Sequence, residues 1–119
     1  MITLGQTVRG LLESTGAPVW YFYPQSGGRL PSVSWRERGS REFAQADGRE
    51  HLAELEYTVD VWSRSPAEIA QLAERIDALM SSVRLRRAWS ADLFDGASGL
   101  HHRSLRYRCV ADAAGNVYQ

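Results

Sequence analysis

The clearest pattern in the chain is the alternation of apolar and polar residues between positions 53 and 63. Apolar residues stand at every second position: Ala53, Leu55, Tyr57, Val59 and Val61. Polar residues stand between them: Glu54, Glu56, Thr58 and Asp60. Because side chains two residues apart share one face of a strand, the pattern predicts a strand with one buried and one hydrated face.

A helix is predicted directly after this strand. Ser65 is a suitable N-cap, Pro66 suits the first helical position, and Glu68 completes a capping box. The apolar residues that follow recur at helical spacing: Ile69, Leu72, Ile76, Leu79, Met80 and Val83.

The rest of the pattern predicts a shorter helix and four more strands. An apolar stripe beginning after Thr3 indicates a helix that Gly16 and Pro18 end. Residues 18–24 are dense in β-formers and are predicted to be a strand buried on both faces. Further strands are predicted around 32–38, 84–94 and 101–112, the last two joined by a turn at 95–99. The element order is α-β-β-β-α-β-β.

This order predicts a single α+β domain over residues 1–119, with a mainly antiparallel sheet of about five strands and two helices packed on one face. The polar face of the last strand is expected to pair with the acidic face of 53–63 if the two are neighbours. Residues 36–50 carry eight charges without periodicity and form either a long hairpin arm or a solvated loop. Residues 113–119 are predicted to be a flexible end.

Composition narrows the function classes. The chain has 119 residues with a formal net charge of zero, and all fourteen of its cationic residues are arginines. Cys109 is the single cysteine, so an internal disulfide and a CxxC metal site are both excluded. No apolar run approaches the roughly 18 residues that span a bilayer, so no membrane is expected as a partner and synthesis is expected in the cytosol.

Few residues suggest catalysis. His101 and His102 are adjacent in a predicted strand, so their rings point to opposite faces and cannot chelate one metal together. A site of His102 with Asp92 and Asp95 near the hairpin turn is the enzymatic alternative. Arginines on the last two strands could bind single-stranded nucleic acid, but the carboxylates offset their charge, so direct nucleic-acid recognition is not predicted. No catalytic residue, metal or cofactor is predicted.

One region resembles a known family. The strand Leu85-Arg-Arg-Ala-Trp89 leads into Ser90-Ala-Asp-Leu-Phe-Asp95, followed by Gly99-Leu-His-His102 and Leu105-Arg-Tyr-Arg108. This series of sequence motifs, which follows a predicted strand and a capped helix, resembles the tail completion proteins of tailed bacteriophages, also called tail terminators. The resemblance covers residues 50–110 well and the first 50 residues loosely.

The resemblance implies a structural virion protein without enzymatic activity, located at the head-proximal end of the tail and made in the cytoplasm of the bacterial host. Its relatives are understood to form a ring, commonly a hexamer, that ends the tail tube and joins the tail to the head. The implied partners are further copies of the chain, the tail tube protein and the head–tail connector or stopper protein. DNA would pass through without sequence-specific binding.

Surface chemistry suggests where such contacts lie. Subunit contacts are expected at the sheet edges and on the charged arm, with an arginine and aromatic anchor formed by Arg38, Arg41, Glu42 and Phe43. The acidic residues Glu54, Glu56 and Asp60 are expected to line the lumen, where negative charge would keep duplex DNA from adhering, or simply to keep one sheet face soluble. Other open functions are a different connector or head-closure ring, a small ligand-binding domain, or an enzyme using His102 and Asp92.

Overall fold

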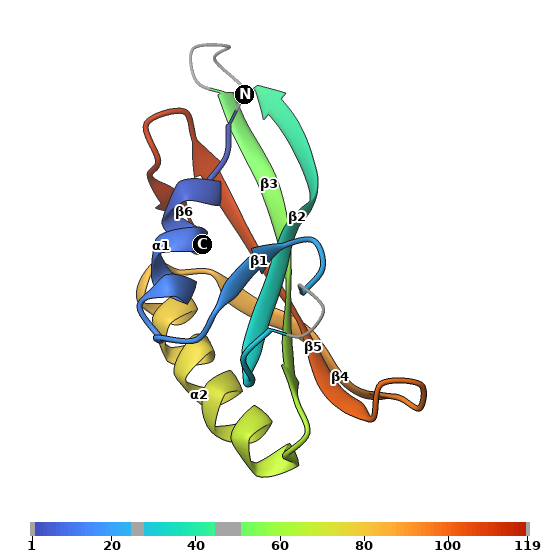
Figure 1. Ribbon diagram of the computed structural model, residues 1–119. Coiled ribbons are helices and arrows are strands. Elements are labelled where there is room, and N and C mark those ends of the chain that lie inside the picture. Colours follow the sequence, from blue (N-terminus) through green and yellow to red (C-terminus); the bar gives the residue numbers. More distant parts are fainter. Residues whose placement is uncertain (1, 25–27, 45–50, 119) are drawn as a thin grey trace.

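The computed structural model describes residues 2–24, 28–44 and 51–118. Within them, two helices cover one face of a six-stranded sheet (Figure 1). The helices are α1 (Gly5–Glu13) and α2 (Pro66–Ser82). The strands are β1 (Val19–Tyr21), β2 (Ser32–Ala44), β3 (His51–Ser63), β4 (Arg86–Asp95), β5 (Leu100–Asp112) and β6 (Val117–Tyr118). The predicted α+β class is confirmed, with one strand more than expected.

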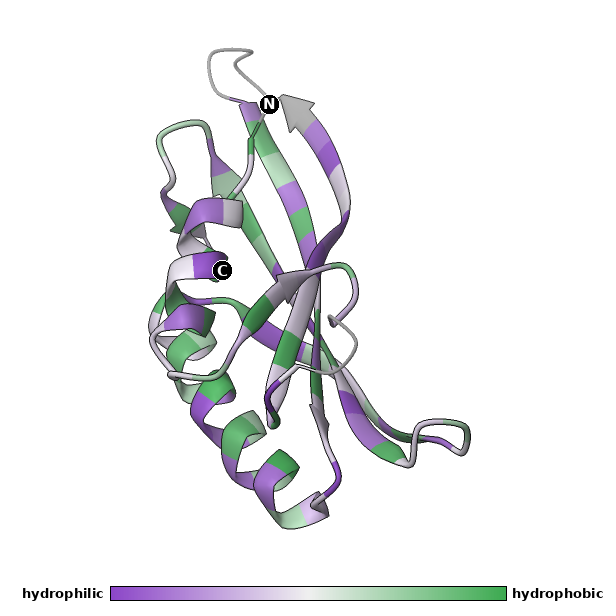
Figure 2. Ribbon diagram, viewed as in Figure 1, coloured by the Kyte–Doolittle hydropathy of each residue, from purple (hydrophilic) through white to green (hydrophobic). Residues whose placement is uncertain are grey.

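The sheet has the order β1-β2-β3-β5-β4, and β6 pairs with β5. All pairings are antiparallel except that of β1 with β2. β3 lies at the centre, and hydrophilic and hydrophobic residues alternate along the strands (Figure 2). Its inward side chains, including Leu55, Tyr57 and Val59, pack into the core beneath the helices. The alternation predicted for residues 53–63 is therefore confirmed.

The charged segment begins as a hairpin arm. Residues 36–44 continue β2 and pair with the first half of β3, with a bulge between Glu37 and Gly39. Charge does not prevent this pairing, because Arg41 stands opposite Glu54 and such cross-strand pairs favour the register. Residues 45–50 lie outside the described residues.

The strand predicted at 18–24 is shorter and more exposed than expected. β1 has three residues and lies at the edge of the sheet, with a partner on one side. Phe22 has φ 76°, a left-handed conformation that ends the strand. The prediction of a strand buried on both faces is therefore wrong, because nothing covers the outer side of this edge in the described residues.

The two helix starts differ. Ser65 Oγ accepts the Glu68 N–H at 3.3 Å and Pro66 begins α2, which confirms that cap. At α1 the N-cap is Leu4, and its side chain makes no capping bond. Thr3 Oγ1 accepts the Gly5 N–H at 3.1 Å. It also lies 3.3 Å from Tyr57 Oη, because β3 places the Tyr57 hydroxyl beside Thr3.

The C-terminal segment forms a turn and a short strand. Asp112 accepts bonds from Asn116 and from the Tyr118 hydroxyl, the latter at 2.7 Å. Val117 and Tyr118 then pair with Ala111 and Val110. Residues 113–118, predicted as a flexible end, therefore have defined secondary structure. Neither described helix combines the length and apolarity needed to cross a membrane.

The sheet face opposite the helices is here called the outer face. It is not uniformly hydrated, since Ser34, Thr58 and Ser104 are buried on it. Trp62 stacks on the ring of His102 with centroids 4.0 Å apart, and its Nε1 donates to Ser34 Oγ at 2.9 Å. The part of this face near the end of β3 is thus covered by its own aromatic side chains.

Candidate assembly surfaces

The acidic residues of β3 lie together on the outer face, two of them beside an arginine and one beside a histidine. Arg41 forms an ion pair with Glu54, and Arg38 Nη1 lies 2.8 Å from Glu56 Oε1. Asp60 Oδ1 lies 3.9 Å from His102 Nε2. The expected neighbourhood of β3 and β5 is confirmed, since Arg108 of β5 stands opposite Glu56 with Nε–Oε1 at 3.9 Å. This face carries both signs of charge.

The arm residues predicted as one contact do not share one surface. Arg38 occupies the β-bulge, which turns its side chain toward Glu56, and Arg41 lies on the same face. The Glu42 side chain lies on the opposite face of the sheet, where its Oε1 accepts the Ile2 N–H at 3.3 Å. Phe43 pairs with Leu52 through its backbone, but its side chain lies outside the described residues.

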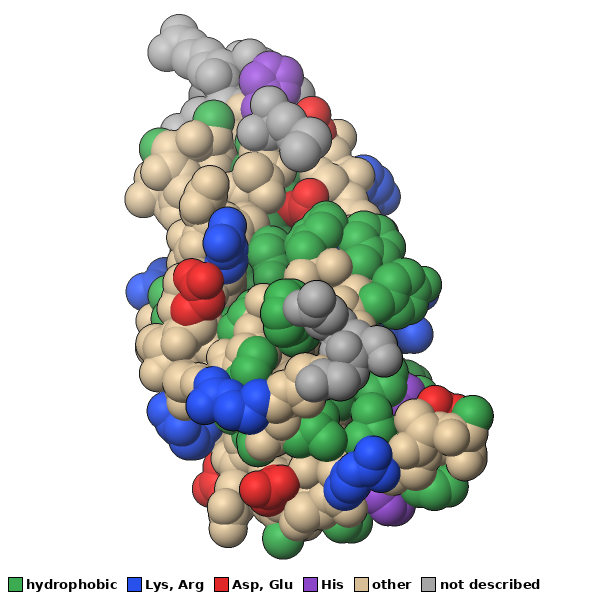
Figure 3. Space-filling model, in the orientation of Figure 1, with side chains coloured by type: hydrophobic (Ala, Val, Ile, Leu, Met, Phe, Trp, Pro, Cys, Tyr) green, Lys and Arg blue, Asp and Glu red, His purple; other side chains and the backbone are tan. Residues whose placement is uncertain are grey.

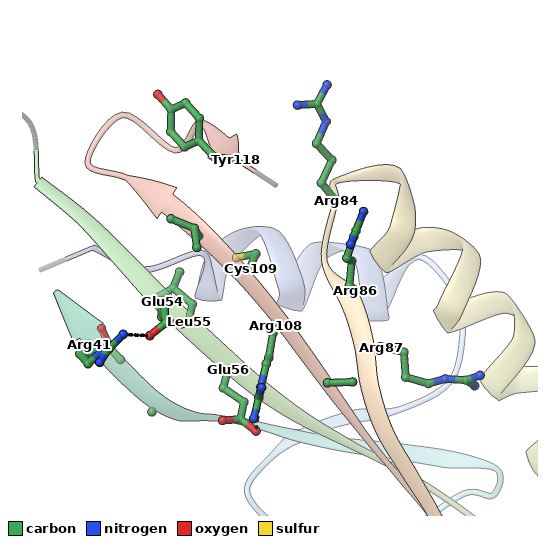
Figure 4. A pocket seen from close by; sticks show the side chains of 14 residues that line it. Arg41, Glu54, Leu55, Glu56, Arg84, Arg86, Arg87, Arg108, Cys109 and Tyr118 are labelled. Atoms are coloured by element: carbon green, nitrogen blue, oxygen red, sulfur yellow. Dashed lines mark ion pairs between the residues drawn. The ribbon is translucent and has the colours of Figure 1, made fainter. Parts of the chain in front are cut away.

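A groove of about 770 Å³ lies between the arm and the start of β4. Figure 4 shows its labelled side chains, which come from β2, β3, β4, β5, β6 and the turn after α2. Its lining includes five arginines and two glutamates: Arg41, Arg84, Arg86, Arg87, Arg108, Glu54 and Glu56. Arg87 is turned toward α2, where its Nη1 lies 2.8 Å from Asp77 Oδ2. The remaining four arginines outnumber the two glutamates. We call this site the arginine groove.

Arg84 borders the arginine groove and has a strained backbone. It has φ 65°, and the helix end around it has the hydrogen bonds of a Schellman motif. The Leu85 N–H donates to Met80 O at 3.0 Å and the Arg84 N–H donates to Ser81 O at 2.9 Å. Glycine is the usual residue at this position, so an arginine here sacrifices stability.

An exposed aromatic patch lies at the opposite edge of the sheet. It consists of Tyr21, Phe22 and Tyr23, which are 57%, 43% and 74% exposed. Tyr21 packs edge-on against Trp35 with centroids 4.9 Å apart, and the Arg36 guanidinium lies 5.6 Å from the Phe22 ring centroid. Figure 3 shows hydrophobic side chains gathered over β1. A contiguous apolar surface of this kind is typical of protein contacts.

The tip of the β4–β5 hairpin also carries exposed apolar side chains. Leu93 and Phe94 are 48% and 59% exposed, between the carboxylates of Asp92 and Asp95. Asp92 pairs with Arg103 at 2.7 Å. Hydrogen bonds from the Ser98 hydroxyl and the Ala97 N–H lower the pKa of Asp95 below its usual value, so this carboxylate is ionised at neutral pH. We call residues 92–95 the hairpin tip.

The fold does not bring together His102 and Asp92, the two residues of the enzymatic alternative. His102 stands opposite Leu93 and Asp92 opposite Arg103, so the two side chains lie on opposite faces of the sheet. Among residues 2–24, 28–44 and 51–118, no three His, Cys, Asp or Glu side chains gather in a metal-binding arrangement. Burial raises the pKa of the Cys109 thiol to about 11, which disfavours a reactive thiolate.

Sequence reasoning missed the aromatic patch and the arginine groove. Three consecutive aromatic residues are typical of a buried strand. The left-handed backbone conformation of Phe22 cannot be predicted from its residue type. The groove joins residues from distant segments, so no spacing reveals it. A weak signal existed at Arg84, since α2 ends without the glycine that commonly follows a helix.

Comparisons with known proteins agree with this fold. A comparison with curated protein sequences gave no match. A similar solved chain is described as "Virion of native gene transfer agent (GTA) particle". The two share 17% sequence identity with a TM-score of 0.50, covering 91% of this chain and 90% of the other. The family model "Tail completion protein gp17" matches residues 6–112. The chain therefore belongs to the tail completion protein gp17 family, structural proteins of the bacteriophage tail.

Proposed function

We propose that this protein forms a ring on the head-proximal end of the tail, where it ends the tail tube and joins it to the head–tail connector. The observation that carries the proposal is the exposure of apolar side chains at both edges of the sheet. Tyr21, Phe22 and Tyr23 lie at one edge, and Leu93 and Phe94 at the other. Two different surfaces on opposite edges favour heterologous contacts, which close into rings when the rotation permits.

Residues of the charged arm are proposed to contribute to these subunit contacts. Arg38, Arg41, Glu42 and Phe43 belong to a strand that extends along the outer edge of the sheet, where β1 leaves it uncovered beyond Trp35. The arginines bring planar donors suited to carboxylates of a neighbouring subunit. The ring is proposed to be a hexamer, with the tail tube protein and the connector or stopper protein as its other partners.

We also propose that Glu54, Glu56 and Asp60 face the lumen. Their common face supports this placement, but the arginines beside Glu54 and Glu56 give the surface mixed charge. A lumen of mixed charge would still let DNA pass without sequence-specific contact. No enzymatic step is proposed, in keeping with the structural role of the family.

The proposal is tested by removing the gene from the phage. Tails are expected to have abnormal lengths and to remain separate from heads in electron micrographs. Restoring the gene on a plasmid should restore attached tails of normal length. Normal, attached tails in the absence of the gene would contradict the proposal, and tails of normal length that fail to attach would favour a connector or head-closure role instead.

A second test concerns the aromatic patch. The triple variant Tyr21→Ser, Phe22→Ser, Tyr23→Ser is expected to fold with normal far-UV circular dichroism, because these side chains lie outside the core. It should fail to complement the gene deletion. The control is Arg9→Ser, which removes an exposed side chain of α1 that pairs with Glu13 at 3.5 Å and should leave complementation intact. Full complementation by the triple variant would exclude the patch as a contact.

A further inference from the structure

Strand β4 carries opposite kinds of surface at its two ends. Its first residue, Arg86, lines the arginine groove, and its last residues form the hairpin tip with two apolar and two acidic side chains. The chain as a whole has a formal net charge of zero. The separation of charge along this strand is therefore a local arrangement and does not follow from the composition.

The two surfaces cannot meet within one molecule. Arg86 and Asp95 are nine residues apart in an extended strand, a separation of about 30 Å at about 3.3 Å per residue. The hairpin projects away from the helices at the end of the molecule opposite the β2–β3 arm (Figure 1). A contact between the tip and the groove must join two molecules.

The chemistry of the two surfaces is complementary. The groove offers guanidinium groups of Arg84, Arg86 and Arg108 around apolar lining such as Val110 and Tyr118. The hairpin tip offers the ionised Asp95 beside the exposed Phe94. Arginine binds carboxylates through two parallel donors and aromatic rings through its planar face, so one arginine-rich groove suits both groups.

The backbone at Arg84 provides a further argument. Its φ of 65° is a conformation in which glycine would be more stable, yet the residue present is an arginine that borders the groove, with its Nη1 3.5 Å from Val117 O of β6. Strain of this kind in a native protein concentrates at functional positions. The strain at Arg84 is an observation separate from the excess of arginines over glutamates, and it concerns the same groove.

We propose that the arginine groove of one copy of this chain receives the hairpin tip of the next copy. Groove and tip are different surfaces, so a contact repeated head to tail generates a ring or an open helix, whereas a reciprocal exchange of tips between two copies would close a dimer and contradict the proposed ring. The inference rests on the proposed ring and specifies which surfaces form it.

The test uses two variants of the full chain that each lose one half of the contact. The tip variant is Phe94→Ser with Asp95→Asn, in which the amide oxygen can still accept the hydrogen bonds of the turn. The groove variant is Arg84→Gly with Arg86→Gln, in which glycine relieves the strained backbone. The control variant is Glu74→Gln, an exposed change on α2 away from both surfaces.

Assembly is measured by sedimentation velocity and native mass spectrometry, with the chain alone and with purified tail tubes of the phage. The wild type and the control are expected to form rings, and each of the other variants should remain monomeric with a melting curve as cooperative as that of the wild type. An equimolar mixture should yield dimers and nothing larger, because an intact tip in one variant can enter the intact groove in the other only once.

The possible failures are distinguishable. Rings formed by the tip variant or the groove variant as readily as by the wild type would overturn the tip–groove contact and leave the ring itself standing. Larger assemblies than dimers in the mixture would also overturn it. A wild type that forms no oligomer in either condition would contradict the proposed function, and the tip–groove contact with it.

Discussion

Tyr57 joins three parts of the chain through one buried hydroxyl group. This residue of β3 is fully buried, and its Oη accepts the Leu4 N–H at 2.8 Å. It also donates to Glu37 Oε1 at 2.8 Å and lies 3.3 Å from Thr3 Oγ1. The bond to Leu4 fixes the start of α1 on the sheet. A side chain predicted only as part of an apolar stripe therefore also orients the N-terminal helix.

Replacing Tyr57 by phenylalanine is expected to lower the free energy of unfolding by about 1–3 kcal/mol, because the buried Leu4 N–H loses its acceptor. Urea unfolding followed by tryptophan fluorescence measures the change. Tyr23→Phe removes the same group from a side chain that is 74% exposed and should change stability by less than about 0.5 kcal/mol. Equal effects of the two substitutions would show that the Tyr57 hydroxyl does not hold the helix.

At the scale of elements, the two ends of α2 contrast. Its start follows common capping rules, extended by Ser63 Oγ, which donates to Glu68 Oε1 at 2.7 Å and accepts the Ser65 N–H at 3.1 Å. Its end carries Arg84 in a left-handed conformation. In the middle, Asp77 accepts the Tyr107 hydroxyl at 2.6 Å and pairs with Arg87, which fastens the helix to β4 and β5.

Ser65→Ala is expected to destabilise the protein by about 1 kcal/mol, because the Glu68 N–H loses its cap. Thermal unfolding followed by circular dichroism measures the loss. Ser81→Ala is the control, an exposed position within the same helix where alanine should be neutral or slightly stabilising. A Ser65→Ala protein as stable as the wild type would mean that other contacts suffice to start the helix.

Arg84→Gly is expected to raise the free energy of unfolding by about 1 kcal/mol, because glycine adopts positive φ without steric conflict. Urea unfolding of the isolated chain measures the change. Arg86→Gly makes the same chemical replacement in an extended strand and should lower stability, since glycine weakens strand interiors. Destabilisation by Arg84→Gly would indicate that the arginine side chain contributes more than the strain removes.

At the scale of the whole molecule, one core is covered by helices while both sheet edges remain open. The molecule is elongated, with extents of 53 × 24 × 21 Å. Long strands that project past the helices give it a large surface for its size, which suits a subunit that contacts several neighbours. The core also contains three weakly acidic side chains that remain uncharged at neutral pH: Tyr57, Tyr107 and Cys109.

These core groups predict a loss of stability at alkaline pH. Burial raises the pKa of all three, that of Cys109 from 9.0 to about 11, and for each tyrosine a bond to a carboxylate adds to the effect. A pKa raised by folding stabilises the native state fully below the unfolded value and no longer above the folded value. The free energy of unfolding should be level from pH 7 to about 8.5 and fall from about pH 9 upward.

Urea unfolding across this pH range measures the effect. In Cys109→Ala the decline should begin about one pH unit later, near the unfolded tyrosine value of 10.0, whatever the variant's stability at pH 7. Identical alkaline profiles for the wild type and Cys109→Ala would show that the thiol is not held uncharged by the fold.

Elements whose signals lie within a few neighbouring residues could be predicted from the sequence. The alternation along 53–63, the cap at Ser65 and the turn at 95–99 each depend on residues close in the chain, so their periods and residue types predicted β3, α2 and the β4–β5 hairpin. The family resemblance likewise rested on short sequence motifs, and the match to the family model confirmed it. Burial of 18–24 was predicted wrongly, because hydrophobicity does not state which strand stands at an edge.

Contacts between residues far apart in the chain could not be predicted from the sequence and became visible in the folded molecule. The arginine groove gathers Arg41, Arg84 and Arg108 from segments far apart in sequence, and the register of β3 with β2 and β5 sets arginines beside Glu54 and Glu56. Glu42 and Arg41 are neighbours in sequence but serve opposite faces of the sheet. Strand order and register depend on the packing of the whole core, which no short stretch of sequence specifies.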